Sequence, residues 1–354
     1  MTGDLRQLRE ARRILFVIQF LAMGDAVLLS PVFRVIKSNV SGVELTLLTT
    51  RYAVPIVRAI PDVDHVYPLE DIFRPGSSRL ERLFRLCAFV LRGRFDTIVL
   101  RDDRRFPERT CHLAARICCL KTVSLGPYLE EEVIANRHIV DTYLRILERG
   151  GFQVGDRRRL YLSVPESAIA QAKALLNGSK GKLAGFAPLG QWRVKNWTPE
   201  KAAQLICRLQ ALAYDVVLFC SDREYSATVQ GLAPNGRLRV VSHVEFSLLM
   251  GILSMCAIFV GVDTGPTHVA AALGVPTVGL YGPTSGIVSA PYSSRGTAVQ
   301  TPVACPYFDP VAPYSPRAKF QECHLDGRCR LPMVNCAEQI DVDSVIRAIE
   351  TVAR

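Results

Sequence analysis

Predominantly apolar runs alternate with longer amphipathic segments from the beginning of the chain. Ile14 to Phe20 and Val43 to Thr49 are short and largely apolar, as is typical of parallel strands buried on both faces. Helical patterns over Ala26 to Lys37 and Ala53 to Ile60 follow them. This order of strand, helix, strand and helix predicts a doubly wound parallel α/β sheet.

The alternation continues and then starts again in the second half of the chain. In the first half it predicts further strands and helices over Val63–Tyr67, Arg79–Leu91, Thr97–Leu100, Arg109–Cys118 and Thr122–Leu125. In the second half it predicts elements over Leu183–Phe186, Pro199–Ala213, Asp215–Cys220, Glu224–Leu232, Leu238–Val241, Ser247–Met255 and Ala257–Val262. Two such series indicate two sheets.

The length of 354 residues is more than one hydrophobic core normally covers. We therefore expect an N-terminal Rossmann-like domain over residues 1–160, a linker helix over 161–178, a second Rossmann-like domain over 179–340 and a terminal helix over 341–354. Two such halves face a central cleft, and the terminal helix could pack on either. A hydrophobic content of 49% with 21% charged residues excludes a disordered chain.

The stretch from Phe259 to Thr284 carries the clearest chemical signal. An apolar strand ends at Val262, the polar segment Asp263 to Thr267 begins a helix, and a second apolar run covers Val275 to Tyr281. Pro266 suits the first turn of that helix, where no amide donor is needed. Amides freed at a helix start carry partial positive charge and bind anions. The segment therefore predicts a phosphate site.

The block DTGPTHVAAALGVPTVGLYGPT resembles the signature of glycosyltransferase family 9, the heptosyltransferases of lipopolysaccharide assembly. The resemblance implies the GT-B arrangement of two Rossmann-like domains. It implies that the donor is bound by Asp263, Thr264, Gly265, Pro266 and His268, with His268 bonding the diphosphate or bracing the turn. An alternative stays open, in which Asp263 and Thr264 only cap the helix and His268 belongs to the core.

The segment Met23-Gly24-Asp25 lies where the first strand meets its helix, at the edge where open sheets bind ligands. This segment lacks the G-x-G-x-x-G motif of dinucleotide-binding sites, which argues against a classical NAD-dependent enzyme. Heptosyltransferases have Gly-Asp at this turn, so the resemblance implies that Asp25 is the general base that deprotonates the acceptor hydroxyl. Alternatively, Asp25 caps the following helix.

The loop Pro188 to Trp197 follows the first strand of the second half. The family has a lysine and a tryptophan here, which Lys195 and Trp197 match, and the resemblance implies that Lys195 holds donor phosphate or the transferred sugar. The family often has Ser or Thr in the preceding turn, where this chain has Gly190 and Gln191. Backbone amides are therefore expected to bind the phosphate there.

Asp222 and Glu224 follow the strand Asp215 to Cys220, where an acid holds ribose hydroxyls in dinucleotide sites. The resemblance implies a glutamate in this region, and either residue could supply the carboxylate. The segment His243 to Phe246, which contains Val244, matches the stretch that contacts adenine in the family.

The formal net charge is +10, and most of the cations are arginines, whose planar fork suits phosphate and carboxylate. The most basic region, Arg74 to Arg109, has ten arginines and five acids, and Arg101, Arg104 and Arg105 are its candidates for binding an acidic acceptor. We expect it to attract an anionic membrane without insertion, unless it is only a solvated face. No nucleic-acid motif is present, so nucleic acid is not an expected partner.

Eleven cysteines, an odd number, argue against a fully paired secreted framework and favour the cytoplasm. The apolar run Ile14 to Met23 is too short to span a membrane, and acidic residues precede it. Four cysteines precede the last helix: Cys305, Cys323, Cys329 and Cys336. Free thiols are favoured there, with a zinc or iron site or a disulfide as the alternative.

Together with the resemblance, these features predict an inverting glycosyltransferase that moves heptose from an ADP-activated donor to a lipopolysaccharide core or another lipid-linked acceptor. Asp25 would deprotonate the acceptor while Lys195 and the amides of Thr264 and Gly265 hold the leaving diphosphate. This scheme requires no cofactor and no metal. The alternatives are a nucleotide-sugar-binding protein without transferase activity and a sugar-nucleotide epimerase on the same fold. We expect the enzyme in the cytoplasm, in peripheral contact with the inner membrane.

Overall fold

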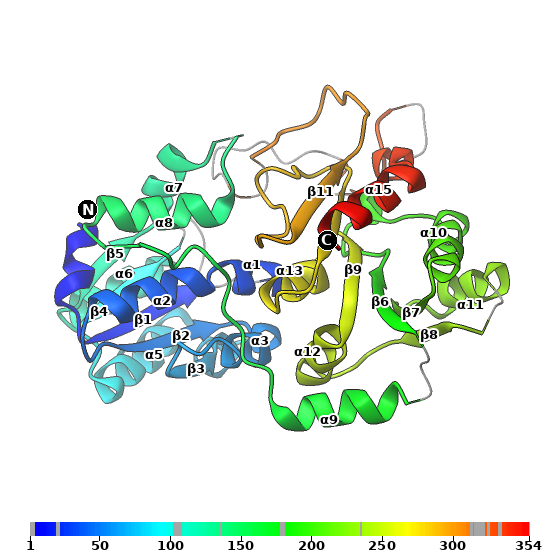
Figure 1. Ribbon diagram of the computed structural model, residues 1–354. Helices are drawn as coiled ribbons and strands as arrows, with labels where there is room; N and C mark the ends of the chain where they lie inside the picture. The colour runs from blue at the N-terminus through cyan, green and yellow to red at the C-terminus, as the bar shows by residue number, and fades with distance from the viewer. Residues whose placement is uncertain are drawn as a thin grey trace. The chain divides into compact units, whose positions relative to one another are not determined.

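The computed structural model describes residues 4–18, 22–101, 108–134, 136–177, 181–233, 236–311, 314, 323, 326–331 and 335–353. The chain divides into two compact units, drawn in Figure 1. Unit 1 comprises Met1–Val133, Ile139–Ser163 and Tyr314–Arg317, and unit 2 comprises Ile134–His138, Val164–Pro313 and Ala318–Arg354. The main passage from one unit to the other thus lies between Ser163 and Val164.

Unit 1 contains a five-stranded sheet in the order β3-β2-β1-β4-β5. Every neighbouring pair of its strands is parallel. The strands are β1 (Arg13–Ile18), β2 (Glu44–Thr49), β3 (His65–Pro68), β4 (Thr97–Leu100) and β5 (Lys121–Ser124). The chain winds outward in one direction from β1 and then returns to build β4 and β5 on the other side. The boundary between β1 and β4 is therefore the topological switch point, where sheets of this kind bind ligands.

The helices of unit 1 cover both faces of this sheet. They are η1 (Leu5–Glu10), α1 (Met23–Leu28), α2 (Ser30–Asn39), η2 (Arg51–Ala53), α3 (Val54–Arg58), α4 (Leu69–Ile72), α5 (Arg79–Gly93), α6 (Glu108–Ile117), α7 (Gly126–Glu132) and α8 (Ile139–Arg149). Leu15 and Val17 of β1 pack in a core with residues of α4, α5 and α6. Phe16 points to the other face, where its ring meets that of Phe33 on α2 edge to face at 5.3 Å. The period of two along a strand therefore divides the core into two layers.

Unit 2 contains a six-stranded parallel sheet in the order β11-β10-β9-β6-β7-β8. Its strands are β6 (Lys182–Ala187), β7 (Tyr214–Phe219), β8 (Leu238–Val241), β9 (Cys256–Val262), β10 (Thr277–Tyr281) and β11 (Gly296–Gln300). Here the order reverses between β6 and β9. The carboxyl ends of these two strands carry the loops after Ala187 and Val262, which are two of the segments that the sequence singles out.

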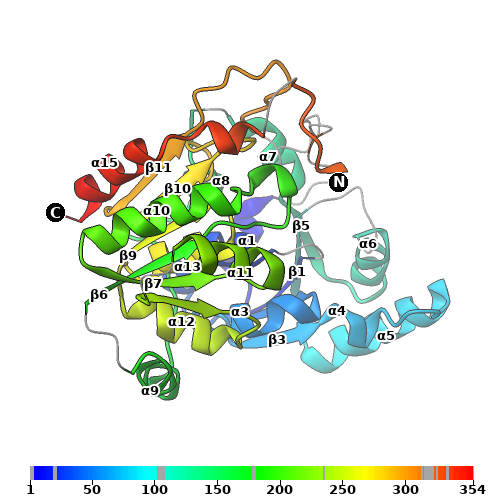
Figure 2. The same ribbon diagram turned by 90° about the vertical axis from the view of Figure 1, so that its right-hand side faces the viewer.

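The helices of unit 2 also form two layers, as Figure 2 shows from the side. They are α9 (Glu166–Leu175), η3 (Arg193–Lys195), α10 (Pro199–Ala211), α11 (Arg223–Leu232), α12 (Phe246–Ser254), α13 (Gly265–Ala272), η4 (Cys336–Gln339) and α15 (Val342–Val352). Residues of α10, α11 and α15 share one core with the sheet. On the other side α9 packs tightly on α12, because a Cβ added to Gly251 would lie 2.4 Å from the carbonyl oxygen of Ala168.

The two Rossmann-like sheets confirm the predicted α/β fold class. One local prediction needs correction. The single helix expected over Ala26 to Lys37 is two helices, α1 and α2, with Leu29 between them, and α1 already begins at Met23. Helix α9 and the terminal helix α15 both lie in unit 2. None of the described helices is long and apolar enough to cross a bilayer.

Candidate functional site

At the switch point of unit 2, Lys195 and Asp263 form a buried ion pair. Nζ of Lys195 donates to Oδ2 of Asp263 at 2.8 Å and to the backbone oxygen of the same residue at 3.0 Å. Their side chains are only 12% and 10% exposed. The pair joins the loop after β6 to the end of β9, because the two residues lie 68 positions apart in the sequence.

His268 completes this cluster from the first turn of α13. Its Nε2 lies 3.3 Å from Oδ1 of Asp263, and its side chain is 3% exposed. Its other ring nitrogen, Nδ1, is buried and has no hydrogen-bond partner within the described part of the protein. His268 thus contacts the carboxylate of Asp263, as expected of a residue that braces the turn. A contact of His268 with the donor diphosphate stays a prediction.

The electrostatics of Asp263 follow from this arrangement. Burial by itself would raise the pKa of the Asp263 carboxyl, but the positive charge of Lys195 and the hydrogen bond from His268 outweigh it and hold that pKa well below its usual range. Asp263 is therefore ionised at neutral pH. A lysine ammonium has three N–H donors, and Asp263 accepts from two of them in the geometry above, so one donor of Lys195 remains for a ligand.

The start of α13 lies beside this ion pair. Thr264 is the N-cap residue in extended conformation, and no side chain in the described chain caps the helix there. Thr267 instead donates its hydroxyl to the backbone oxygen of Val262 at 2.7 Å, which fixes the turn from inside. Amides at an uncapped helix start are suited to a phosphate, and Gly265 has no side chain that would obstruct it.

The loop before Lys195 is held in place by its own residues. The amide of Gly190 donates to Oδ1 of Asn196 at 2.8 Å. A Cβ at Gly190 would lie 3.5 Å from Val262, 3.7 Å from the Lys195 side chain and 3.8 Å from the Asp263 backbone oxygen, so the loop passes directly beside the ion pair. Gln191 is exposed.

Two tryptophans near this loop have different roles. Nζ of Lys195 lies 4.2 Å from the centre of the Trp192 ring, a cation–π contact that the sequence analysis did not anticipate. Trp197 is buried at 1% exposure and packs against Phe186 at 6.2 Å between ring centres. The tryptophan that the resemblance emphasised is therefore a core residue, and Trp192 is the one that touches the lysine.

The expected ribose and base residues lie at the same edge of the sheet. Asp222 caps α11, because its Oδ1 accepts from the amide of Tyr225 at 3.0 Å. Glu224 is exposed in the first turn of that helix, and Val244 is half-buried in the loop before α12. Capping occupies the Asp222 carboxylate, which leaves Glu224 as the more available of the two acids.

At the switch point of unit 1, Asp25 is half-buried in the first turn of α1 rather than in a turn before the helix. Arg101 follows β4 and hydrogen-bonds with Tyr143 of α8, and the charge of Asp25 acts on the same phenol. Burial is the main reason why the pKa of Tyr143 is raised, Arg101 opposes the rise, and Asp25 adds to it. The fold thus brings together a carboxylate, a guanidinium and a phenol from three distant segments.

Sequence reasoning missed Tyr143. The residue lies within a helix with no motif around it, and only the packing of α8 beside the sheet brings it to Arg101. Two other predicted acceptor residues, Arg104 and Arg105, lie outside the described residues.

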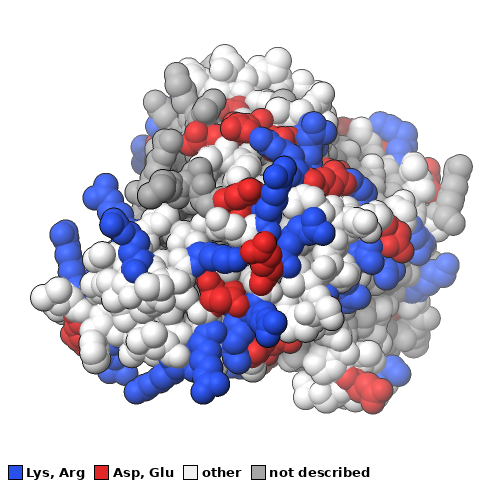
Figure 3. All heavy atoms as spheres, turned by 90° about the vertical axis from the view of Figure 1, so that its left-hand side faces the viewer, with Lys and Arg blue, Asp and Glu red and all other residues white. Residues whose placement is uncertain are grey.

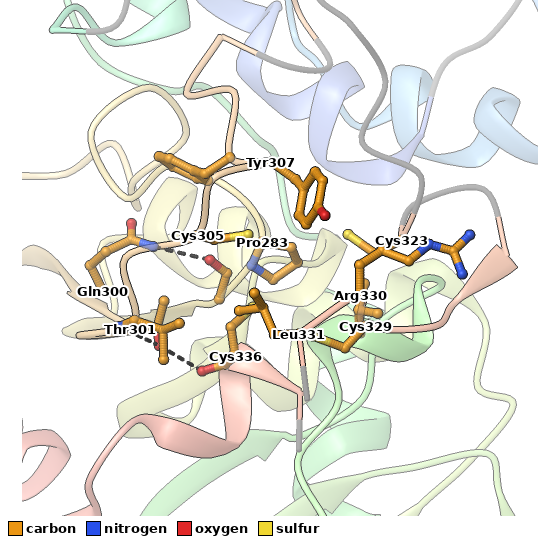
Figure 4. A pocket seen from close by; sticks show the side chains of 14 residues that line it. Pro283, Gln300, Thr301, Cys305, Tyr307, Cys323, Cys329, Arg330, Leu331 and Cys336 are labelled. Atoms are coloured by element: carbon orange, nitrogen blue, oxygen red, sulfur yellow. Dashed lines mark hydrogen bonds between the residues drawn. The ribbon is translucent and has the colours of Figure 1, made fainter. Parts of the chain in front are cut away.

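The four cysteines before the last helix surround one pocket of unit 2, shown in Figure 4. Cys305 lies on one side of this pocket, and Cys323 and Cys329 lie on the other. The backbone oxygen of Cys336 accepts the hydroxyl of Thr301 at 2.6 Å, and burial raises the pKa of the Cys336 thiol to about 12. Among the described residues, no group of three or more His, Cys, Asp or Glu side chains is placed to hold a metal ion. The state of these four cysteines stays a prediction.

Comparison with known proteins gives concordant results. The sequence profile of glycosyltransferase family 9 (heptosyltransferase) matches residues 130–308. Lipopolysaccharide heptosyltransferase 3 of Escherichia coli is 23% identical over 290 residues, which cover 77% of this chain and 84% of the relative. The solved glycosyl transferase family 9 structure from Veillonella parvula DSM 2008 matches with a TM-score of 0.75 at 21% identity, covering 100% of this chain and 98% of that one. E. coli heptosyltransferase WaaC with ADP matches with a TM-score of 0.63 at 17% identity, covering 96% and 99%.

Proposed function

The chain belongs to glycosyltransferase family 9, and we propose that it transfers heptose from an ADP-activated donor to a saccharide of the lipopolysaccharide core, with inversion at the anomeric carbon. Relatives with this sequence pattern are lipopolysaccharide heptosyltransferases, and a solved structure of the same fold holds ADP. In this proposal, the site residues of the two units would supply the chemistry that such a reaction needs.

Unit 2 is the donor side in this proposal. The remaining donor of Lys195 and the amides at the start of α13 would bind the diphosphate, and Asp263 would keep Lys195 in place. Negative charge grows on the diphosphate as the bond to the sugar breaks, so a fixed cation and fixed amide dipoles stabilise the transition state more than the ground state. Glu224 and Val244 would hold the ribose and the base.

Unit 1 is the acceptor side. A sugar hydroxyl is a weak nucleophile, and a carboxylate that takes its proton contributes roughly 10²- to 10⁴-fold to the rate. Asp25 would accept that proton as the hydroxyl oxygen attacks the anomeric carbon opposite the departing diphosphate, which inverts the configuration. Arg101, which hydrogen-bonds with the same Tyr143 on which the charge of Asp25 acts, would orient an acidic acceptor.

The cellular location follows from the same proposal. A nucleotide-sugar donor is expected on the cytoplasmic side of the inner membrane.

The observation that carries the proposal is the buried ion pair of Lys195 and Asp263 beside the uncapped start of α13. The test is a thermal-shift series with ADP-, GDP- and UDP-sugars, followed by detection of the glycosylated acceptor by mass spectrometry. A ligand at 100 times its Kd stabilises the folded state by about 2.7 kcal/mol, so ADP-heptose should raise Tm clearly. Stabilisation by UDP-sugars alone would favour the epimerase alternative, and donor binding without product would favour a non-catalytic binding protein.

A further inference from the structure

Helix α5 exposes a row of large apolar side chains. Leu80, Phe84 and Leu91 are 79%, 74% and 63% exposed. In an ideal helix of 3.6 residues per turn these positions lie within roughly 40° of one another. The core-facing side of the same helix is formed by other residues, Leu86 and Val90. The exposed row is therefore a second apolar face, which packing inside unit 1 does not explain.

The neighbouring helix α6 extends this surface. Leu113 and Ile117, one turn apart on α6, are 47% and 57% exposed. Cys87 of α5 interacts directly with Cys118, the residue after Ile117, so the two helices meet beside the exposed row. Figure 2 shows α5 and α6 as neighbours. Large contiguous apolar surface of this kind usually marks an interaction site.

Helix α5 carries more arginines than acids. In an ideal helix Arg79, Arg85 and Arg92 lie roughly 100–120° from the middle of the apolar row, and Arg82 lies on the opposite side. The one acid of α5 is Glu81. Glu81 is already paired with Arg85 at 2.9 Å. Figure 3 shows blue cationic side chains that stand out from uncharged surface at its left. An amphipathic helix with apolar side chains and flanking arginines has the composition of an interfacial membrane helix.

We propose that the surface formed by Leu80, Phe84 and Leu91 of α5, with Leu113 and Ile117 of α6, docks on an anionic lipid membrane. The three apolar side chains of α5 enter the boundary between headgroups and acyl chains, and the arginines of α5 bind the headgroup phosphates. The charge pattern alone predicts electrostatic attraction without insertion, whereas the exposed apolar row favours insertion of these side chains. A second copy of the chain is the less favourable occupant, because it would bring the same cluster of arginines and a net charge of +10 against this surface.

The test is co-sedimentation of the full chain with vesicles of phosphatidylglycerol and phosphatidylcholine, compared with vesicles of phosphatidylcholine alone. The wild type should bind the anionic vesicles and bind the neutral ones at least tenfold more weakly. A triple variant, Leu80→Gln with Phe84→Gln and Leu91→Gln, should lose at least tenfold in binding. The matched control is Leu212→Gln with Leu232→Gln, which changes exposed leucines of unit 2, each 48% exposed, and should bind like the wild type.

A second pair of measurements separates insertion from surface attraction. Reversal of charge, Arg79→Glu with Arg92→Glu, should weaken binding mainly at low salt, because screening removes the attraction between exposed charges at high salt. A Phe84→Trp variant should show a blue shift of tryptophan emission on anionic vesicles. Unchanged binding of the triple variant, or no blue shift, would contradict docking through this surface. A dimer in light scattering that the triple variant abolishes, without vesicle binding, would assign the surface to self-association.

The outcome is independent of the proposed catalytic function. The triple variant should transfer sugar to a water-soluble acceptor fragment at the wild-type rate and lose rate only with an acceptor embedded in vesicles. Failure of the wild type to transfer to either acceptor would count against the catalytic proposal and leave the vesicle measurement valid.

Discussion

The two units use the same place in the fold in different ways. At the switch point of unit 2, Lys195, Asp263 and His268 are at least 88% buried and bonded to one another. At the switch point of unit 1, Asp25 is half-buried in the first turn of a helix. The first arrangement is buried, and the charges of Lys195 and Asp263 neutralise each other, whereas the second leaves a partly exposed carboxylate.

This difference fits the two tasks in the proposed reaction. A diphosphate is best stabilised by charges and dipoles that are already in position, because their reorganisation then costs nothing during the reaction. A general base must instead be reached by the proton that it removes. Variants at the two edges should therefore fail in different ways, on the donor side in affinity and on the acceptor side in turnover.

The largest effect is expected from Asp25→Asn, which keeps the shape of the side chain and removes its basicity. Turnover should fall by roughly 10²- to 10⁴-fold, and donor affinity measured by calorimetry should stay within about twofold of the wild type. Asp156→Asn is a suitable control, because the Asp156 side chain is 100% exposed in the same unit. An Asp25→Asn enzyme within threefold of wild-type activity would make Asp25 only a helix-terminal residue.

The next effect is expected from Lys195→Met on the donor side. Hydrogen bonds to charged groups contribute about 1.5–3 kcal/mol, so donor affinity should fall by roughly 10- to 100-fold. The variant should also lose stability, because it leaves the buried Asp263 carboxylate without its main partner. Lys195→Arg should restore stability, since it keeps the charge.

The matched control for this experiment is Lys173→Met, which changes an exposed lysine of α9 and should alter neither quantity. Titrations well below the melting temperature separate lost affinity from partial unfolding. Donor affinity that is unchanged in folded Lys195→Met would place the phosphate site elsewhere in unit 2.

The sequence predicts the two sites unequally well. The segment from Asp263 to His268 carries its signal locally, because the strand end, the turn and the helix start are contiguous, and the structure brings Lys195 to it. The site in unit 1 depends on tertiary packing. Tyr143 reaches Arg101 only through the position of α8, and no local pattern around Tyr143 reports that contact.

Missed elements have similar physical explanations. Strand β11 (Gly296–Gln300) is a short edge strand of half-buried and exposed residues, so it lacks the continuous apolar run that marks the central strands. Helix α8 differs from β11, because its sequence has a clear helical apolar period and only its packing beside the sheet is not encoded locally. Trp197 fits into the core beside Phe186, and Trp192 contacts Lys195 instead. The spacing of the two tryptophans in the sequence does not determine which of them enters the core.

The smallest effect is expected in the melting temperature of Asp263→Asn. The way in which its difference from the wild-type melting temperature changes with pH is the sharpest test of the buried cluster. The folded-state pKa of Asp263 lies well below its usual range, whereas an aspartate in the unfolded chain titrates near about 3.9. A carboxyl with a depressed pKa stabilises the fold fully above the unfolded pKa, and that contribution is lost as the pH falls toward the folded pKa. The wild type should therefore melt several degrees above Asp263→Asn near pH 6.

That gap should narrow as the pH is lowered below about 4, where the unfolded wild-type chain begins to gain a proton at this position. Other carboxyls titrate in the same range, but both proteins share them, so they cancel in the difference between the two melting temperatures. Asp156→Asn, which changes a fully exposed carboxyl, should show almost no gap at any pH. A gap for Asp263→Asn that widens in acid would mean that Asp263 is not held ionised by Lys195 and His268, and the distinction between a rigid donor edge and an open acceptor edge would lose its electrostatic basis.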